Sequence, residues 1–313
     1  MILIDFSQVM ISNLFVLKPA MKVGPYTASI SMELPDGKSK TSTLNFPGVP
    51  DKTPEINEDL LRHMVLNSIR YYKMKFSEKY GRLVICCDNR HYWRKDVFKY
   101  YKAGRKKNRD RSLLDWNLIF DSLNKLRGEL AEYSPYQVVN VDGAEADDLI
   151  GVIAKRNHTA EKILVLSGDK DFVQLQKWPN IEQYAPIQKH FISTDNPTTT
   201  LREHIMLGDA GDGIPNFKSP DDTFVSGTRQ VTIRRVDLER WIKESKPENF
   251  CDSKMLRGYG RNQNLIDLDF IPKPIQSAIV TEWDKPFTES RKKLWDYFVK
   301  FKLATLADHI GEF

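Results

Sequence analysis

The stretch YQVVNVDGAEADDLIGVIAKRNHTAEKILVLSGDKDF (136–172) decides the fold, because it combines two apolar runs with a helical pattern and two acidic loops. Residues 136–141 and 162–167 are typical of buried strands, and residues 144–156 between them are predicted to be a helix. Strands joined by a helix run parallel. The acidic loops that follow the two strands should therefore lie at the same edge of a sheet, where open α/β sheets bind ligands.

The same alternation fills the first half of the chain. Residues 1–5 (MILID) and 82–87 (RLVICC) are predicted strands, and residues 57–80 and 113–130 are predicted amphipathic helices. The predicted fold class is therefore α/β, with a central, mostly parallel sheet and flanking helices.

Two other regions differ from this pattern. Residues 22–47 alternate around Pro35-Asp36-Gly37, which predicts an appended β-hairpin of unknown role. After about Trp178, strand signals at 181–192 give way to a mostly helical second half. Its predicted helices are 198–207, 235–246, 254–268 and 290–300.

Composition excludes several classes of protein. The chain has 313 residues, a net charge of +5, and no apolar run of the ~20 residues that a membrane-spanning helix needs. No basic segment precedes the apolar N-terminus, so we expect no signal peptide. Three cysteines give no disulfide framework or zinc pattern, and a reducing cytoplasm is the expected location.

The positive charge is concentrated in one segment. Residues 90–111 carry ten Lys and Arg against two Asp, a local balance of +8 that leaves the remainder of the chain at −3. Such a basic stretch suggests contact with a polyanion. Its five aromatic residues either stack on unpaired bases or pack into the core, and the sequence leaves both readings open.

At least one acidic residue follows every predicted strand of the first half. These residues are Asp5, Asp88, Glu145, Asp147, Asp169 and Asp171, and the loop LGDAGDGIPN (207–216) adds Asp209 and Asp212. A single Asp after a strand is often only a helix cap, but acids at four strand ends together predict a shared site.

Carboxylates gathered at one edge repel each other unless a cation lies among them. Oxygen ligands favour Mg²⁺ or Mn²⁺, and the sequence shows no nearby His or Cys that would suggest a softer site. So many acids predict two metal ions, Mg²⁺ with Mn²⁺ as a substitute. Two such ions ~4 Å apart can activate a water and stabilise the leaving oxygen of a phosphodiester.

Together these motifs resemble the flap-endonuclease, or 5′-nuclease, superfamily, and within it the ribonucleases H of T-even bacteriophages. The similar stretches run from end to end of the chain. They are LIDFSQ (3–8), CCDN (86–89), HYWRKD (91–96), YYKAGRKKNR (100–109), EADDLI (145–150), SGDKDFVQL (167–175), GDAGDGIPN (208–216) and FVKFKLATLADHIGEF (298–313).

The resemblance implies a role for each matching residue. Asp5, Asp88, Glu145, Asp147, Asp169, Asp171 and Asp212, with Asp209 as a further candidate, would hold two magnesium ions. Lys102 and Arg105 would be the catalytic cations at the scissile phosphate. Residues implied in nucleic-acid binding are Arg94, Tyr101, Lys106, Lys107, Lys218, Arg229, Arg234 and Arg235, with Tyr101 stacking on the base beside the cut.

The resemblance also implies a domain organisation. Residues 1–190 would form an α/β two-metal nuclease core with a helical arch at about 92–115. Residues 191–313 would form a helical DNA-binding domain with a helix-turn-helix element. The stretch 216–230 departs from the family's glycine-rich loop, so no potassium site is expected.

The function implied is a Mg²⁺-dependent 5′ to 3′ exonuclease and flap endonuclease with ribonuclease H activity. It would act on branched or nicked duplex DNA, 5′ flaps and RNA:DNA hybrids, and remove primers during lagging-strand replication. We expect a monomer without membrane contact, in the host bacterial cytoplasm if phage-encoded, with a single-strand DNA-binding protein as a possible partner. Two alternatives stay open: a structure-specific DNA-binding protein without catalysis, and a ribonuclease of the PIN-like fold.

Overall fold

The computed structural model describes residues 1–16, 26–33, 39–46, 57–110, 115–244, 246–288 and 290–313. Within these ranges it does not describe the side chains of residues 14–16, 26–33, 39–46, 106–108 and 110.

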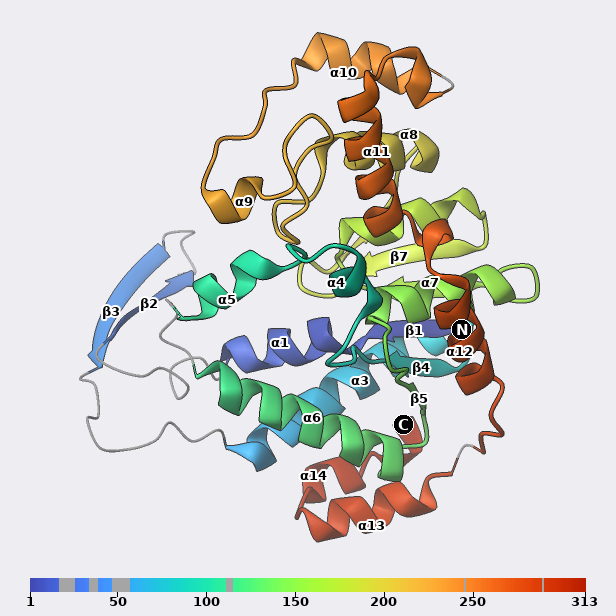
Figure 1. The fold of residues 1–313 in the computed structure, drawn as a ribbon. Coiled ribbons are helices and arrows are strands. Elements are labelled where there is room, and N and C mark those ends of the chain that lie inside the picture. The colour runs from blue at the N-terminus through green and yellow to red at the C-terminus, as the bar shows by residue number, and fades with distance from the viewer. Residues whose placement is uncertain (17–25, 34–38, 47–56, 111–114, 245, 289) are drawn as a thin grey trace.

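A six-stranded sheet forms the centre of the molecule (Figure 1). Its strand order is β5-β4-β1-β6-β7-β8, and all neighbouring pairs are parallel except β7 and β8. The strands are β1 (Ile2–Asp5), β4 (Leu83–Cys86), β5 (Gln137–Val139), β6 (Ile163–Leu166), β7 (Ile181–Ala185) and β8 (His190–Ile192). The predicted fold class and the four strands predicted in the first half are confirmed.

Helices cover both faces of this sheet. Along β1, Ile2 and Ile4 point to one face, while Leu3 points to the other, as alternation along a strand requires. The first face is covered by α1 (Phe6–Val16), α3 (Glu58–Tyr80), α6 (Trp116–Tyr133), α13 (Lys292–Lys300) and α14 (Ala304–Ala307). The second face is covered by α7 (Ala146–Asn157) and α12 (Lys273–Trp283).

A third apolar cluster lies beside the sheet and joins the basic segment to the second half of the chain. Phe98 and Tyr101 pack there with buried residues between 205 and 266. Its surroundings are α4 (Trp93–Val97), α5 (Ala103–Asp110), α8 (Pro197–Leu207), α9 (Thr223–Ser226), α10 (Arg235–Ile242) and α11 (Ser253–Ile266). Short 3₁₀ helices complete the described part: η1 (Lys170–Lys177), η2 (Pro247–Asn249), η3 (Leu268–Phe270) and η4 (Ile310–Glu312). The domain division at residue 190 stays a prediction, and the chain beyond residue 268 packs back onto the sheet.

The predicted hairpin forms a separate two-stranded sheet. Strands β2 (Tyr26–Glu33) and β3 (Ser39–Phe46) pair antiparallel, with Tyr26 opposite Phe46. The hairpin lies beyond α1 and α5 (Figure 1), and its predicted turn at Pro35-Asp36-Gly37 falls outside the described residues. Among the described helices, none combines the length and apolarity that crossing a bilayer requires.

Gly258 is the point at which α11 touches the loop before α9. A Cβ atom there would lie 2.0 Å from the backbone oxygen of Phe217, whereas one at Gly260 in the same helix would meet nothing within 4 Å. We therefore expect Gly258→Ala to lower the free energy of unfolding by about 2–3 kcal/mol, because backbone must move. Gly260→Ala should raise it by up to about 1 kcal/mol. Urea unfolding of the two variants measures both effects, and equal changes in the two would contradict the packing described here.

Candidate active site

The first turn of α7 gathers carboxylates from two parts of the chain. Glu145 is its N-cap, and the carboxylate of Asp148 accepts a hydrogen bond of 2.9 Å from the Glu145 N–H. Asp88, which follows β4, accepts one of 2.8 Å from the Ala146 N–H. The free N–H groups of a helix start stabilise negative charge. This helix start therefore holds Asp88 beside Glu145 and Asp147 at the carboxyl edge of the sheet.

Asp5 is buried and Asp147 half-buried, both close to further carboxylates. Burial, together with the negative charges of Asp88 and Asp169, raises the pKa of Asp5 to about 7 against hydrogen bonds from Gln8 and Ser167 that lower it. Burial also raises the pKa of Asp147 well above its usual range, and Asp169, Asp5 and Glu145 contribute to that rise. These acids are thus near enough to oppose each other's ionisation.

The acids after β6 and α8 extend the same group. Asp169 caps η1 by accepting a hydrogen bond of 3.0 Å from the Asp171 N–H. Burial and Asp169, followed by Asp212 and Asp209, raise the pKa of Asp171 to about 7. The structure therefore brings all eight predicted metal ligands together, and we call this set the carboxylate rim. Its members are Asp5, Asp88, Glu145, Asp147, Asp169, Asp171, Asp209 and Asp212.

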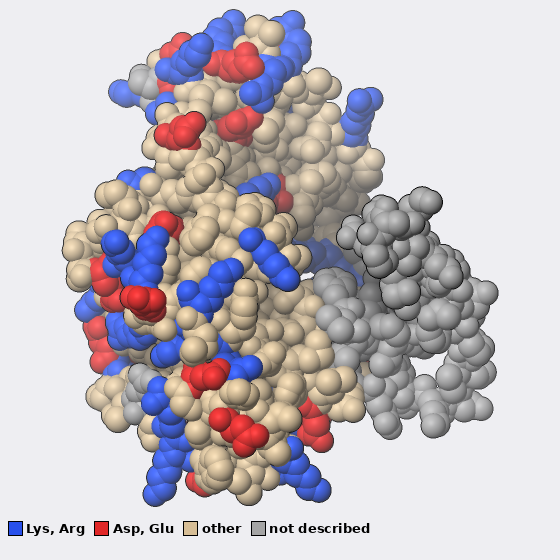
Figure 2. All heavy atoms as spheres, turned by 180° about the vertical axis from the view of Figure 1, so that it is seen from behind, with Lys and Arg blue, Asp and Glu red and all other residues tan. Residues whose placement is uncertain are grey.

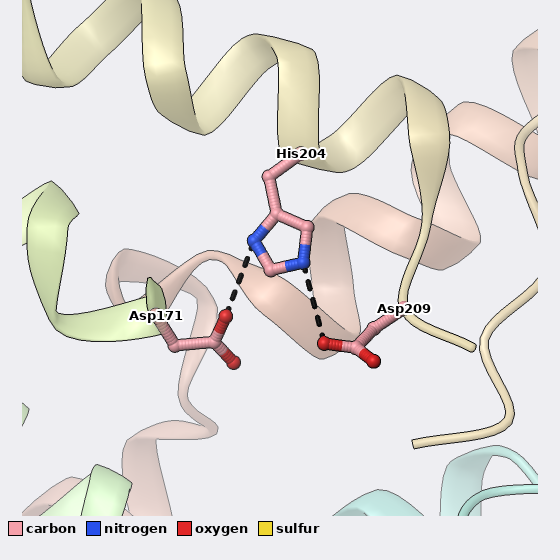
Figure 3. Close-up of side chains that lie close together, drawn as sticks. All are labelled: Asp171, His204 and Asp209. Atoms are coloured by element: carbon pink, nitrogen blue, oxygen red, sulfur yellow. Dashed lines mark ion pairs between the residues drawn. The ribbon is translucent and has the colours of Figure 1, made fainter. Parts of the chain in front are cut away.

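His204 is a member of this site that the sequence analysis missed. It comes from the last turn of α8, and its ring lies between Asp171 and Asp209 (Figure 3). Nδ1 is 3.1 Å from Asp171 Oδ1, and Nε2 is 3.5 Å from Asp209 Oδ2. The expectation of a site without nearby histidine was therefore wrong. The signal was its position five residues before Asp209, but the 32 residues between it and Asp171 hid the contact.

The rim suits a divalent cation. In the described part of the chain, Asp171 Oδ1 and His204 Nε2 are buried without a hydrogen-bond partner, which is costly for polar atoms. Three candidate ligand atoms, one each from Asp171, His204 and Asp209, lie within 4.8 Å of one another. A cation would satisfy these atoms and remove the repulsion among the carboxylates.

Lys102 and Arg105 lie against this rim. Lys102 Nζ is 2.5 Å from Glu145 Oε1 and 3.7 Å from Asp212 Oδ2, and Arg105 Nη2 is 2.5 Å from Asp212 Oδ1. Burial lowers the pKa of the Lys102 ammonium, but Glu145 and Asp212 outweigh it and raise that pKa. Both cations are therefore held charged beside the predicted ligands.

The backbone of Lys102 is also unusual. Its φ of 56° lies in the left-handed region, which costs a non-glycine residue about 1 kcal/mol or more. The Lys102 N–H donates a hydrogen bond of 2.7 Å to the Asp212 carbonyl, which ties the basic segment to the loop after α8. Strain of this kind is often found at functional positions.

Two residues predicted to bind nucleic acid are instead inside the protein. Arg94 is 3% exposed, and its guanidinium contacts Glu145, Asp148 and the Leu265 carbonyl. Tyr101 is also 3% exposed, and its hydroxyl lies within hydrogen-bond distance of two carboxylates, Glu145 at 3.1 Å and Asp212 at 2.9 Å. Buried polar groups need hydrogen-bond partners, and these two side chains find them in carboxylates of the rim and its neighbour Asp148. Both side chains therefore help to hold the carboxylate rim in place. Tyr101 also lines the neighbouring cleft, so its predicted contact with a base stays a prediction.

A cleft of about 900 Å³ opens between the basic segment and α6. Asp88 and Glu145 of the rim line it together with a row of cations. These cations are Arg90, Lys95, Lys99, Lys102, Arg105 and Arg109. The basic residues of segment 90–111 thus face the acidic site. On the opposite side of the molecule, Figure 2 shows basic and acidic residues mixed over the described part of the surface.

The other predicted nucleic-acid contacts lie away from the rim. Arg229 and Arg234 are exposed between α9 and α10, and Arg235 is exposed at the start of α10. Lys218 lies over the Trp241 ring at 5.6 Å. The side chains of Lys106 and Lys107 are outside the described residues.

Removing divalent metal should lower stability most at alkaline pH. Asp5 and Asp171 have folded-state pKa values of about 7, above their usual 3.8, so their contribution to stability is present at low pH and lost as the pH rises through 7. We expect metal-free protein to melt at a lower temperature at pH 8 than at pH 5.5. Saturating Mg²⁺ should restore about 2–3 kcal/mol at pH 8, since it binds only the folded chain. Calorimetry with EDTA or Mg²⁺ measures the melting temperature at the two pH values. A melting temperature that changes with neither metal nor pH would contradict the prediction.

Comparison with known proteins gives matches over most of the chain. The family model described as "5'-3' exonuclease, N-terminal resolvase-like domain" matches residues 61–203, and "T4 RNase H, C terminal" matches residues 197–313. The "Ribonuclease H" of Enterobacteria phage T4 is 36% identical over 284 residues, which are 87% of this chain and 92% of that protein. The "Flap endonuclease Xni" of Shewanella sediminis is 32% identical over 133 residues, which are 39% of this chain and 48% of that protein.

The fold is also similar to a solved structure. The phage T5 5′-exonuclease, in a structure described with bound zinc, superposes with a TM-score of 0.56 and 11% identity. The match covers 90% of this chain and 97% of that one. This likeness shows a shared fold.

Proposed function

The chain belongs to the 5′-3′ exonuclease family of nucleases, and on this premise we propose that it is a Mg²⁺-dependent 5′ nuclease and flap endonuclease. Its proposed substrates are branched or nicked duplex DNA, 5′ flaps and RNA:DNA hybrids, cut to remove primers during lagging-strand replication. The observation that carries the proposal is the carboxylate rim with Lys102 and Arg105 beside it.

The members of the carboxylate rim would hold two divalent cations. When bound, such cations supply an activated water and neutralise charge that develops on a phosphodiester. Lys102 and Arg105 would add positive charge at the scissile phosphate, where preorganised cations lower the barrier most. The cations that line the cleft would guide the phosphate backbone to this point.

Other residues would position the substrate. Arg229, Arg234 and Arg235 are exposed and would contact duplex phosphates, with Lys218 beside them. Residues 191–313 would thus serve in duplex binding, and we propose a monomer. A contact between the C-terminal helices and a single-strand DNA-binding protein is a further part of this proposal.

The test is cleavage of a 5′-labelled flap and a 5′-labelled RNA:DNA hybrid. With Mg²⁺ we expect products that end in a 3′-hydroxyl and a 5′-phosphate, and with EDTA no cleavage. Intact substrates in Mg²⁺ would refute the proposal. Equal cleavage of unstructured RNA without preference for 5′ ends would instead favour a PIN-like ribonuclease activity.

A further inference from the structure

We propose that His204 is a metal ligand, so that one of the two cation positions of this chain is a mixed nitrogen and oxygen site formed with Asp171 and Asp209. The inference rests on the proposed function in assuming a divalent cation at the rim. It goes further by adding an imidazole to an otherwise carboxylate site. Its consequence is a preference at this position for a transition-metal cation such as Mn²⁺ or Co²⁺ over Mg²⁺.

The three side chains already have the spacing of a coordination shell. They come from η1, from the end of α8 and from the loop after it, and the ring of His204 lies between the two carboxylates (Figure 3). Their candidate ligand atoms lie within 4.8 Å of one another. Ligands at ~2.1 Å from a shared ion are separated by up to ~4.2 Å, so only a small contraction is needed.

The contacts of the ring with Asp171 and Asp209 leave two buried polar atoms of the cluster without a hydrogen bond. His204 Nε2 and Asp171 Oδ1 lack a hydrogen-bond partner within the described residues, although they are buried and close to charged groups. A histidine placed only to orient the two carboxylates would be expected to donate a well-aligned hydrogen bond. A cation that accepts an electron pair from the ring and from Asp171 leaves neither atom unsatisfied.

The surroundings favour positive charge at this point. His204 lies in the last turn of α8, where the helix carries the negative end of its dipole. Lys170 Nζ is 3.1 Å from Asp209 Oδ2, but its side chain is 58% exposed and can turn into solvent. A bound ion would therefore replace a mobile ammonium without displacing a buried group.

The imidazole changes which metal the site prefers. Mg²⁺ binds oxygen ligands and enters nitrogen sites poorly, whereas affinity for nitrogen rises from Mn²⁺ through Co²⁺. Even the loss of a residue that only hydrogen-bonds to a metal ligand typically lowers metal affinity 10- to 100-fold. We therefore expect His204→Ala to weaken Mn²⁺ binding at one site by about 10-fold or more, and Mg²⁺ binding by less than about 3-fold.

Pulsed electron paramagnetic resonance tests the contact directly. The full-length protein is loaded with Mn²⁺ at about pH 8, where a neutral imidazole can coordinate, with and without ¹⁵N-labelled histidine. We expect a nitrogen hyperfine coupling that changes with the isotope and disappears in His204→Ala. The matched control is His190→Ala, an exposed histidine on β8, which should keep the coupling.

The outcomes separate this inference from the proposed function. Stoichiometric Mn²⁺ without nitrogen coupling in the unmodified protein would overturn the role of His204, while Mg²⁺-dependent cleavage would still stand. A coupling that survives His204→Ala would overturn it as well. Failure to bind either cation would overturn the metal-dependent function itself. The labelled wild-type measurement does not depend on whether the variant folds.

Discussion

Lys102→Ala should reduce the rate of flap cleavage by about 10²–10³-fold at saturating substrate. The ammonium is held at the rim by Glu145 and by a strained backbone that is fixed to the Asp212 carbonyl. A preorganised charge of this kind acts on the transition state without reorganising during the reaction, so its removal lowers kcat more than it raises KM.

The control for this variant is Lys99→Ala. Lys99 lines the same cleft but belongs to none of the described ion pairs with the rim, so its loss should weaken substrate binding modestly and leave kcat nearly unchanged. Single-turnover kinetics with a 5′-flap substrate separate the two effects. Mn²⁺ binding should persist in both variants, and a Lys102→Ala enzyme with normal kcat would remove Lys102 from the mechanism.

The sheet and its acidic edge were predictable because both follow from local patterns. Each apolar run of the first half became a strand, and parallel pairing then brought Asp5, Asp88 and Asp169 to one edge. The hairpin also followed from alternation on both sides of a turn signal. These features need only the period of the sequence and the direction of the strands.

Helix α1 was not predicted because it begins at Phe6, directly after β1 ends at Asp5. No loop separates the two elements, so the sequence does not reveal where the strand becomes a helix. Its capping signals are equally weak, since its first turn carries no acidic residue. Tertiary packing against α3 and β1 defines it instead.

The roles of single side chains at the site were harder to predict, because they depend on contacts distant in sequence. Arg94 was expected to bind nucleic acid, but it contacts Glu145 and Asp148, which lie more than 50 positions away in the sequence. His204 approaches Asp171 only because α8 packs on η1. A sequence motif identifies which acidic residues lie at the edge of the sheet. The basic residues that pair with them depend on how the second half of the chain packs against the sheet.

Asp147→Asn should lower the rate of flap cleavage by at least about 10³-fold relative to wild type. The affinity for DNA should stay the same or increase. Asp147 is half-buried at the start of α7 among Asp5, Glu145 and Asp169. The amide preserves the shape of the side chain but removes a charge that a divalent cation needs. Metal ions contribute several kcal/mol to phosphodiester cleavage, and each 1.36 kcal/mol is tenfold in rate.

Binding should respond in the opposite direction, because a negative charge beside the phosphate backbone has been removed. Asp142→Asn is the matched control, since Asp142 is exposed in the loop before α7, five residues earlier, and its substitution should leave both cleavage and binding unchanged. Flap cleavage and fluorescence anisotropy with labelled flap DNA measure the two quantities. If Asp147→Asn cuts as fast as Asp142→Asn, the carboxylate rim is not the catalytic centre, whatever its charge.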